Sequence, residues 1–133
     1  MVKQVTKIIL PIHYEQKFKT KKSKKFLVGL NWYRNCHHAI SNTVKHYYHE
    51  LVIEQIKDTK FKKIRLEYDV YVARNGTDGH NIRSVIEKFF LDGLVESGAI
   101  PDDNTQEYVM RDSTRYFLDK DNPRIEINII EVK

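Results

Sequence analysis

The segment "KKIRLEYDVYVA", residues 62–73, constrains the fold of this chain more than any other stretch. Its apolar residues Ile64, Leu66, Tyr68, Val70 and Val72 alternate with the charged residues Lys63, Arg65, Glu67 and Asp69. Because successive side chains of a strand point to opposite faces, this alternation predicts a half-buried strand.

A break, "NGTDG" at residues 75–79, separates this strand from a segment with a helical period. We expect a second, C-terminal helix from about His80 to Ser97, ended by Gly98. Its apolar stripe is Ile82, Val85, Ile86, Phe89 and Leu94.

Three further strands and an earlier helix complete the expected order. A short strand covers 6–12, and a helix runs from about 35 to 58. The apolar face of that first helix consists of Ile40, Val44, Tyr47, Tyr48 and Leu51. Two closing strands, 107–118 and 124–132, are joined by the turn "DKDNP".

The sequence thus predicts a single α+β domain over residues 1–133, in the order β-α-β-α-β-β, with a small mixed sheet packed against two helices. A chain of 133 residues is long enough to bury a core of this kind. No apolar run approaches the roughly 18 residues of a membrane helix, and the opening "MVKQVTKIILPIHYEQ" turns polar too soon for a signal peptide. Cys36 is the only cysteine, so we expect no intrachain disulfide and a reducing cytoplasm.

The formal charge of +5 is concentrated in residues 13–30, "HYEQKFKTKKSKKFLVGL". Six lysines face one acidic residue there, and the rest of the chain is balanced. The segment has no apolar period, which indicates a loop. A solvated loop and a loop that binds phosphates both fit this pattern, because dense positive charge attracts phosphates.

Carboxylates flank the second helix. Asp78 lies immediately before it, and Asp102 and Asp103 follow it in "IPDDN". We expect that loop to return along the sheet beside the strand end that carries Asp78, where oxygens from two loops would suit Mg²⁺. Simpler roles are a helix cap for Asp78 and a turn for Asp102.

The helix itself carries polar residues beside its apolar stripe. At about 100° per residue, Asn81, Lys88 and Asp92 fall within one narrow arc, whereas Glu87 points away toward solvent. A lysine in this arc would stabilise charge on a phosphate. Lys88 and Asp92 would otherwise form an ordinary exposed helix pair.

"DGHN", residues 78–81, and "EKFFLDGLVESGAIPDDN", residues 87–104, resemble the RusA family of Holliday-junction resolvases. In that family a D-x-D-N motif leads into a helix with a K-x-x-x-D-A-L-x-x-x-G-x-x-x-D-D pattern. The matching positions are Asp78, Asn81, Lys88, Asp92, Leu94, Gly98, Asp102 and Asp103. "GLNWYRN", residues 29–35, resembles the family's segment after the first strand, so the resemblance covers nearly the whole chain.

Two departures from the family pattern matter. His80 replaces the second aspartate of D-x-D-N, which removes one expected carboxylate. About four extra residues separate Asn81 from Lys88, which is about one helical turn and keeps both on one face. The longer "EKFF" form is similar to that of phage-type members.

The resemblance implies a Mg²⁺-dependent endodeoxyribonuclease, with Mn²⁺ as a possible substitute and no organic cofactor. Asp78 and Asp103 would hold the metal, completed by Asp102 and waters, with His80 as a possible nitrogen ligand. Lys88 would lie against the scissile phosphate. The implied products are nicks with 5′-phosphate and 3′-hydroxyl ends that a ligase seals.

The implied partners are branched DNA and a second copy of the chain, because a four-way junction and a homodimer share two-fold symmetry. The expected contacts to the DNA backbone are Lys19, Lys21, Lys22, Lys24, Lys25, Asn31 and Arg34. Trp32 and Tyr33 would stack on an exposed base or pack the loop onto the core. The implied setting is a phage or prophage in the cytoplasm of a bacterial host.

Other functions remain open. With His80 in place of an aspartate, the chain could be a branched-DNA binding protein that kept the fold and lost catalysis. A flap or a replication fork could replace the four-way junction as substrate. His38, His46 and His49 could form a surface zinc site, but ligand spacing does not support one, and we expect these histidines to be exposed.

Overall fold

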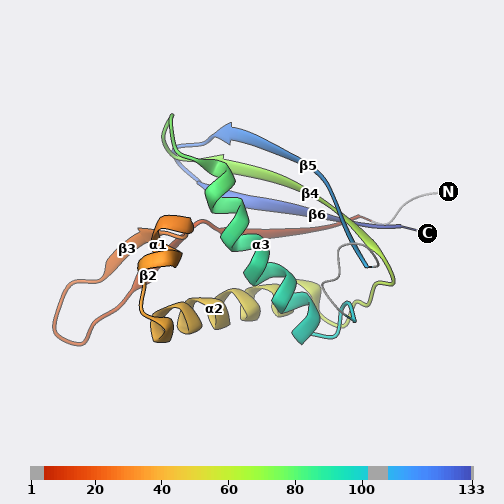
Figure 1. The fold of residues 1–133 in the computed structure, drawn as a ribbon, viewed down its shortest axis with the longest axis horizontal. Coiled ribbons are helices and arrows are strands. Elements are labelled where there is room, and N and C mark those ends of the chain that lie inside the picture. Colours follow the sequence, from red (N-terminus) through yellow and green to blue (C-terminus); the bar gives the residue numbers. More distant parts are fainter. Residues whose placement is uncertain (1–4, 102–107, 133) are drawn as a thin grey trace.

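The structure, a computed structural model, describes residues 5–101 and 108–132, with the side chains of 111 and 112 excepted. It has one four-stranded sheet with helices on one face and a separate two-stranded hairpin (Figure 1). The elements are β1 (Val5–Pro11), β2 (His13–Gln16), β3 (Lys24–Leu27), α1 (Leu30–Asn35), α2 (His38–Ile56), β4 (Ile64–Val72), α3 (Gly79–Glu96), β5 (Val109–Leu118) and β6 (Arg124–Glu131).

The large sheet is mixed, as predicted. Its strand order is β1-β6-β4-β5. β6 is antiparallel to β1 and to β4, whereas β4 and β5 are parallel. Parallel neighbours require a crossover connection, and α3 supplies it. The single α+β domain with a mixed sheet is therefore confirmed.

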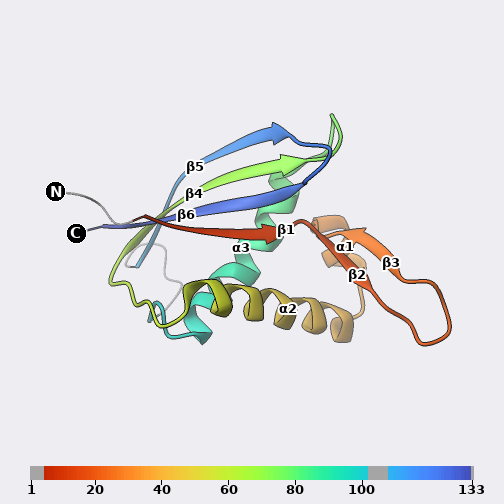
Figure 2. The same ribbon diagram turned by 180° about the vertical axis from the view of Figure 1, so that it is seen from behind.

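The core lies between the sheet and the two long helices, α2 and α3, which share one side of the sheet (Figures 1 and 2). The five alternating apolar residues of β4 are buried, as the period of two predicts. The whole predicted stripe of α3 is buried as well. None of the helices in the described part of the chain is both long and apolar enough to cross a membrane.

The lysine-rich segment differs from the expected loop because its two ends form the β2–β3 hairpin. Tyr14 pairs with Phe26 across this hairpin, and their ring centroids are 5.7 Å apart. A third, short helix, α1, follows it. Strands of four residues are too short to display a period of two, so the sequence pattern did not reveal them.

Two side chains expected at the surface are buried. Glu87 is only 6% exposed, and its carboxylate accepts a hydrogen bond from Arg83 Nη1 at 3.0 Å. Since α3 buries a wider face than its apolar stripe, the flank that carries Glu87 is covered too. His49 is only 4% exposed, because α2 and α3 approach closely where Gly93 faces it. It is hydrogen-bonded through Nδ1 to the carboxylate of Glu96.

Candidate nucleic-acid interface

The β2–β3 hairpin projects from the body of the protein and carries the lysine cluster (Figure 2). All six lysines of residues 17–25 are exposed. The base of the hairpin is held by aromatic contacts: Tyr14 packs edge-on against Tyr47 of α2 at 5.2 Å, and Phe26 stacks on Trp32 of α1 at 5.0 Å. The lysines therefore stand on an anchored arm, with Lys19, Lys21 and Lys22 in the turn between the strands.

Helix α1 carries the other predicted DNA contacts, Asn31 and Arg34, and both are exposed. Its two aromatic residues have different surroundings. Tyr33 packs edge-on against Phe89 of α3 at 5.9 Å, so it fixes α1 to the core. Trp32 is partly exposed beside the hairpin.

Lys88 is exposed on α3, with its Nζ 5.6 Å from the centroid of the Tyr33 ring. It lies ten residues after Asp78, which is about 15 Å along a helix axis. Lys88 therefore lies beside α1 near the middle of α3, whereas Asp78 is at the N-terminus of that helix. Asp92, one turn further on, forms an ion pair with Lys45 of α2 at 3.9 Å.

Asp78 is the N-cap residue of α3, and Asn81 holds its carboxylate. Asp78 Oδ1 accepts from the Asn81 backbone N–H at 3.3 Å, and Oδ2 accepts from Asn81 Nδ2 at 2.9 Å. The carboxylate is exposed and each oxygen has a further lone pair, so the cap leaves room for a cation.

A shallow cavity of about 270 Å³ adjoins Asp78 and includes His80 and Tyr116 in its lining. The Tyr116 ring lies directly over Gly79, where an added Cβ would collide with it. The close packing of the Tyr116 ring against the N-terminus of α3 thus requires glycine at position 79.

Asp102 and Asp103 lie outside the described residues. Their described neighbours mark the ends of that connection: Pro101 follows α3, and β5 begins at Val109, which pairs with Ile64 at the start of β4. Asp78 instead comes after Val72, the last residue of β4. A strand of this length, nine residues, spans about 30 Å. The described ends of the loop therefore flank the opposite end of β4 from Asp78, and a shared metal site stays a prediction.

Within residues 5–101 and 108–132, no three histidine, cysteine, aspartate or glutamate side chains are grouped to hold a metal ion. His38 and His46 are exposed as expected. The Asp78 carboxylate is the predicted ligand whose geometry is described in full, and its free oxygen lone pairs are of the kind that Mg²⁺ prefers.

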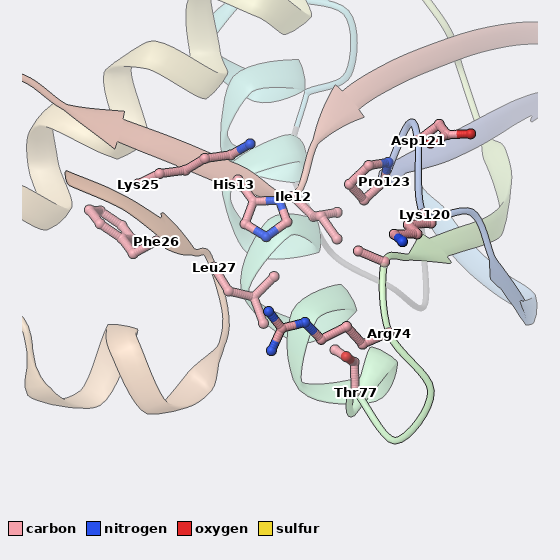
Figure 3. Close-up of a pocket in the computed structure, with 11 residues that line it drawn as sticks. Ile12, His13, Lys25, Phe26, Leu27, Arg74, Thr77, Lys120, Asp121 and Pro123 are labelled. Atoms are coloured by element: carbon pink, nitrogen blue, oxygen red, sulfur yellow. The ribbon is translucent and has the colours of Figure 1, made fainter. Parts of the chain in front are cut away.

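A cleft of about 590 Å³ separates the hairpin from the loops after β4 and β5 (Figure 3). Four basic side chains and one acidic side chain line it, which are His13, Lys25, Arg74, Lys120 and Asp121. Figure 3 shows the Arg74 guanidinium extending toward Leu27 of the hairpin, beside Thr77. Because Thr77 lines this cleft and also the cavity at Asp78, the two hollows adjoin. We call this region the cationic cleft.

Two turns hold the outer wall of the cationic cleft. In the first, Gly76 takes φ of +86°, and the Thr77 N–H donates to the Arg74 carbonyl at 3.4 Å. In the second, Arg124 Nη1 donates to the Asp119 carboxylate at 2.8 Å and also to the Asn122 carbonyl at 2.8 Å. The hydrogen bond from Arg124 to the Asp119 carboxylate lowers the pKa of Asp119. The loop that presents Lys120 is thus tied at both ends.

The surroundings of His13 in the cationic cleft lower its pKa. Burial lowers the pKa of this imidazole, and the charge of Lys25 lowers it further. His13 is therefore mostly neutral at pH 7. A bound anion would offset the charge of Lys25 and favour protonation of His13.

Sequence reasoning missed three members of this cleft: His13, Arg74 and Lys120. They come from the hairpin, from the loop after β4 and from the loop after β5, and only the topology brings them together. The one available signal was the proximity of Arg74 to Asp78 in the sequence.

The sequence matches no protein-family model, and the search of curated proteins found no relative. The relation to the RusA family accordingly stays a prediction based on the residues quoted above.

Proposed function

We propose that this protein is a Mg²⁺-dependent, structure-selective endodeoxyribonuclease that cuts branched DNA, with four-way junctions as its main substrate. The observation that carries this proposal is the cationic cleft. It connects the exposed lysines of the hairpin with the turn that presents the Asp78 carboxylate.

DNA binding is supported by the arrangement of the charges. The lysine hairpin gives contacts to phosphates without reading bases, and Lys25, Arg74 and Lys120 extend this positive surface to the edge of the Asp78 turn. A phosphate backbone that follows the surface would bring one phosphodiester close to Asp78. Lys88 would hold the same strand further along α3, next to α1.

The exposed carboxylate oxygens of Asp78 would suit a hard divalent cation. Asp78 would hold Mg²⁺ with waters, and the ion would supply an activated water and charge stabilisation at the phosphate. A share of Asp102 and Asp103 in this ion stays a prediction from the family pattern, because the described ends of their segment flank the other end of β4. Asn81 keeps the Asp78 carboxylate in one orientation. Arg74 and Lys25 would fix the phosphodiester. Attack of water on the phosphorus, with the 3′ oxygen as the leaving group, would give the 5′-phosphate and 3′-hydroxyl ends that the family resemblance implies.

We further propose that two copies act together, because paired nicks in a junction need two sites related by two-fold symmetry. The proposed setting is the cytoplasm of a bacterial host. A flap or a fork would use the same surface, so the choice of substrate has to be measured.

A second candidate function is branched-DNA binding without catalysis. The observation that favours it is His80, which stands exposed next to Asp78 where the family pattern has an aspartate. A neutral imidazole supplies nitrogen, whereas Mg²⁺ prefers oxygen.

The test uses labelled four-way junctions, with fork, flap and linear duplex as further substrates. Binding and cleavage are followed in the same samples, with and without Mg²⁺, for the wild type and for Asp78→Asn and Asp103→Asn. Asp58→Asn, which changes an exposed carboxylate outside the cleft and the cavity at Asp78, is the matched control.

Mg²⁺-dependent paired nicks that both site variants lose, while they still bind the junction, would support the nuclease. Tight junction binding with no cleavage in Mg²⁺ or Mn²⁺ would favour the binding protein. Binding that is equal for junction and linear duplex would contradict both.

A further inference from the structure

The hairpin has a second hollow on its other face. Lys24 and Lys25 are neighbours in β3, so their side chains point to opposite faces of the strand. Lys25 lines the cationic cleft, whereas Lys24 lines a second cavity of about 390 Å³ between the hairpin and α1; Phe26 contributes to the lining of both. Gln16, which pairs with Lys24 across the hairpin, lines this cavity too.

An aromatic wall forms one side of the cavity. Trp32 and Phe26 both line it, and they stack with 5.0 Å between ring centroids and 22° between ring planes. Trp32 remains partly exposed. Tyr33, its neighbour, faces Phe89 instead and does not line the cavity.

A pair of asparagine amides forms another part of the lining. Asn31 and Asn35 lie one turn apart on α1, and Asn35 Nδ2 donates to the Asn31 carbonyl at 2.7 Å and to Asn31 Oδ1 at 3.2 Å. These bonds fix both amides. Among the hydrogen bonds of the described residues, none involves Asn31 Nδ2 or Asn35 Oδ1. A donor and an acceptor thus stay available side by side.

We propose that this cavity binds one unpaired nucleobase of branched DNA. The base would stack on the aromatic wall at Trp32, its polar edge would face the amides of Asn31 and Asn35, and its phosphate would contact Lys24. Every base has a face that stacks on an aromatic ring, and each base edge presents donors and acceptors that an amide matches. This inference rests on the proposed binding of branched DNA.

The position of the cavity supports an unpaired nucleotide over a base in a duplex. A base inside a duplex is stacked on both faces and cannot reach a concave pocket without leaving its stack. Strands diverge at a branch point, where a base loses a stacking partner. The cationic cleft lies against the same β2–β3 hairpin. A DNA backbone bound in the cleft would therefore be close enough to place a neighbouring unpaired base in the cavity.

Trp32 is the only tryptophan of the chain, so its fluorescence reports directly on the cavity. The first experiment titrates the wild-type protein, without Mg²⁺, with a short single-stranded oligonucleotide and with a matched strand that contains only abasic sites. We expect quenching by the first strand, and binding weakened about tenfold for the abasic strand, because a stacked base contributes on that scale. Equal quenching and equal affinity for both strands would overturn the proposal.

Substitutions in the cavity test whether the base binds there. Asn35→Ala should weaken binding of the normal strand and leave the abasic strand unaffected, while Asn42→Ala, at an exposed position of α2, is the matched control. With 2-aminopurine in the strand as reporter, Trp32→Leu should lose base stacking and Trp32→Phe should retain part of it. Melting temperatures verify that each variant is folded. A Trp32→Leu variant that is folded and keeps full 2-aminopurine quenching would contradict the proposal.

Two further measurements distinguish a free nucleotide from DNA as the ligand, and failure of the base pocket from failure of the proposed nuclease activity. A deoxynucleoside monophosphate tests whether the ligand is a free nucleotide; saturation as tight as with the oligonucleotide would overturn the assignment to DNA. Junction cleavage is measured separately. A protein that cuts junctions without base-dependent quenching refutes the base pocket alone, whereas base-dependent quenching without cleavage refutes the nuclease alone.

Discussion

Asn81 binds both carboxylate oxygens of Asp78, one through its backbone N–H at 3.3 Å and one through its side-chain amide at 2.9 Å. Asp78 therefore caps α3 and is also held in a single orientation at the mouth of the cationic cleft. Capping needs only a side-chain oxygen, whereas metal binding needs the charge of a carboxylate. The two roles of Asp78 can be separated by substitution.

Asp78→Ser should preserve the cap and remove the charge. We expect its free energy of unfolding to stay within about 0.5 kcal/mol of the wild type, whereas Asp78→Ala should lose about 1 kcal/mol. Both variants should lose junction cleavage. Denaturant unfolding and the cleavage assay measure the two effects. Full cleavage by Asp78→Ser would rule out a metal-binding role for this carboxylate.

The basic side chains of the cationic cleft should contribute to DNA binding through charge. We expect Arg74→Ala and Lys120→Ala each to lower junction affinity and to reduce the slope of log K against log salt by about one, since each phosphate contact releases about one counterion. Lys62→Ala, which changes an exposed lysine before β4, is the control. If the cleft variants and Lys62→Ala have the same slope, DNA does not follow the cleft.

His13 should make the stability of the protein depend on pH. Burial and the charge of Lys25 lower its pKa in the folded state, so the unfolded state binds more protons as the pH falls through the ordinary value of 6.5. The wild type should therefore lose stability as the pH falls from above 6.5 toward the lowered pKa, and His13→Gln should lose less over the same range. Parallel denaturant unfolding of both proteins tests this. Identical pH profiles would contradict the assigned shift.

The sequence was sufficient for the parts of the fold that repeat a simple period. The alternation in β4 and the stripe of α3 each extend over many residues, so one buried face was visible in the residue order. The α2 face was visible only in part: Val44 and Tyr48 are buried as predicted, whereas Tyr47 is exposed. His49 was placed wrongly, because angular position on one helix says nothing of how closely α3 approaches. Glu87 was misplaced for the related reason that α3 is covered on a flank as well.

The site was less predictable than the core. The cationic cleft combines side chains from three segments separated by as much as 107 positions, His13 to Lys120. Lys25 was predicted as a DNA contact, but His13, Arg74 and Lys120 look like ordinary surface residues in the sequence. The hairpin was missed because its contacts are aromatic pairs between elements, such as Tyr14 with Tyr47. Asp102 and Asp103, on which the metal prediction depends, lie outside the described residues.

Gly79 and Tyr116 should be coupled. A Cβ at position 79 would collide with the Tyr116 ring, so Gly79→Ala should destabilise the protein by about 1–3 kcal/mol, the usual cost of overpacking. Tyr116 is 49% exposed, so Tyr116→Ser should be milder and should relieve the collision in the double variant. In a background with Tyr116→Ser, Gly79→Ala should even be neutral or stabilising, because alanine favours a helix over glycine. Denaturant unfolding of the four proteins gives the coupling free energy. Additive effects would show that the ring does not cover the N-terminus of α3 in solution.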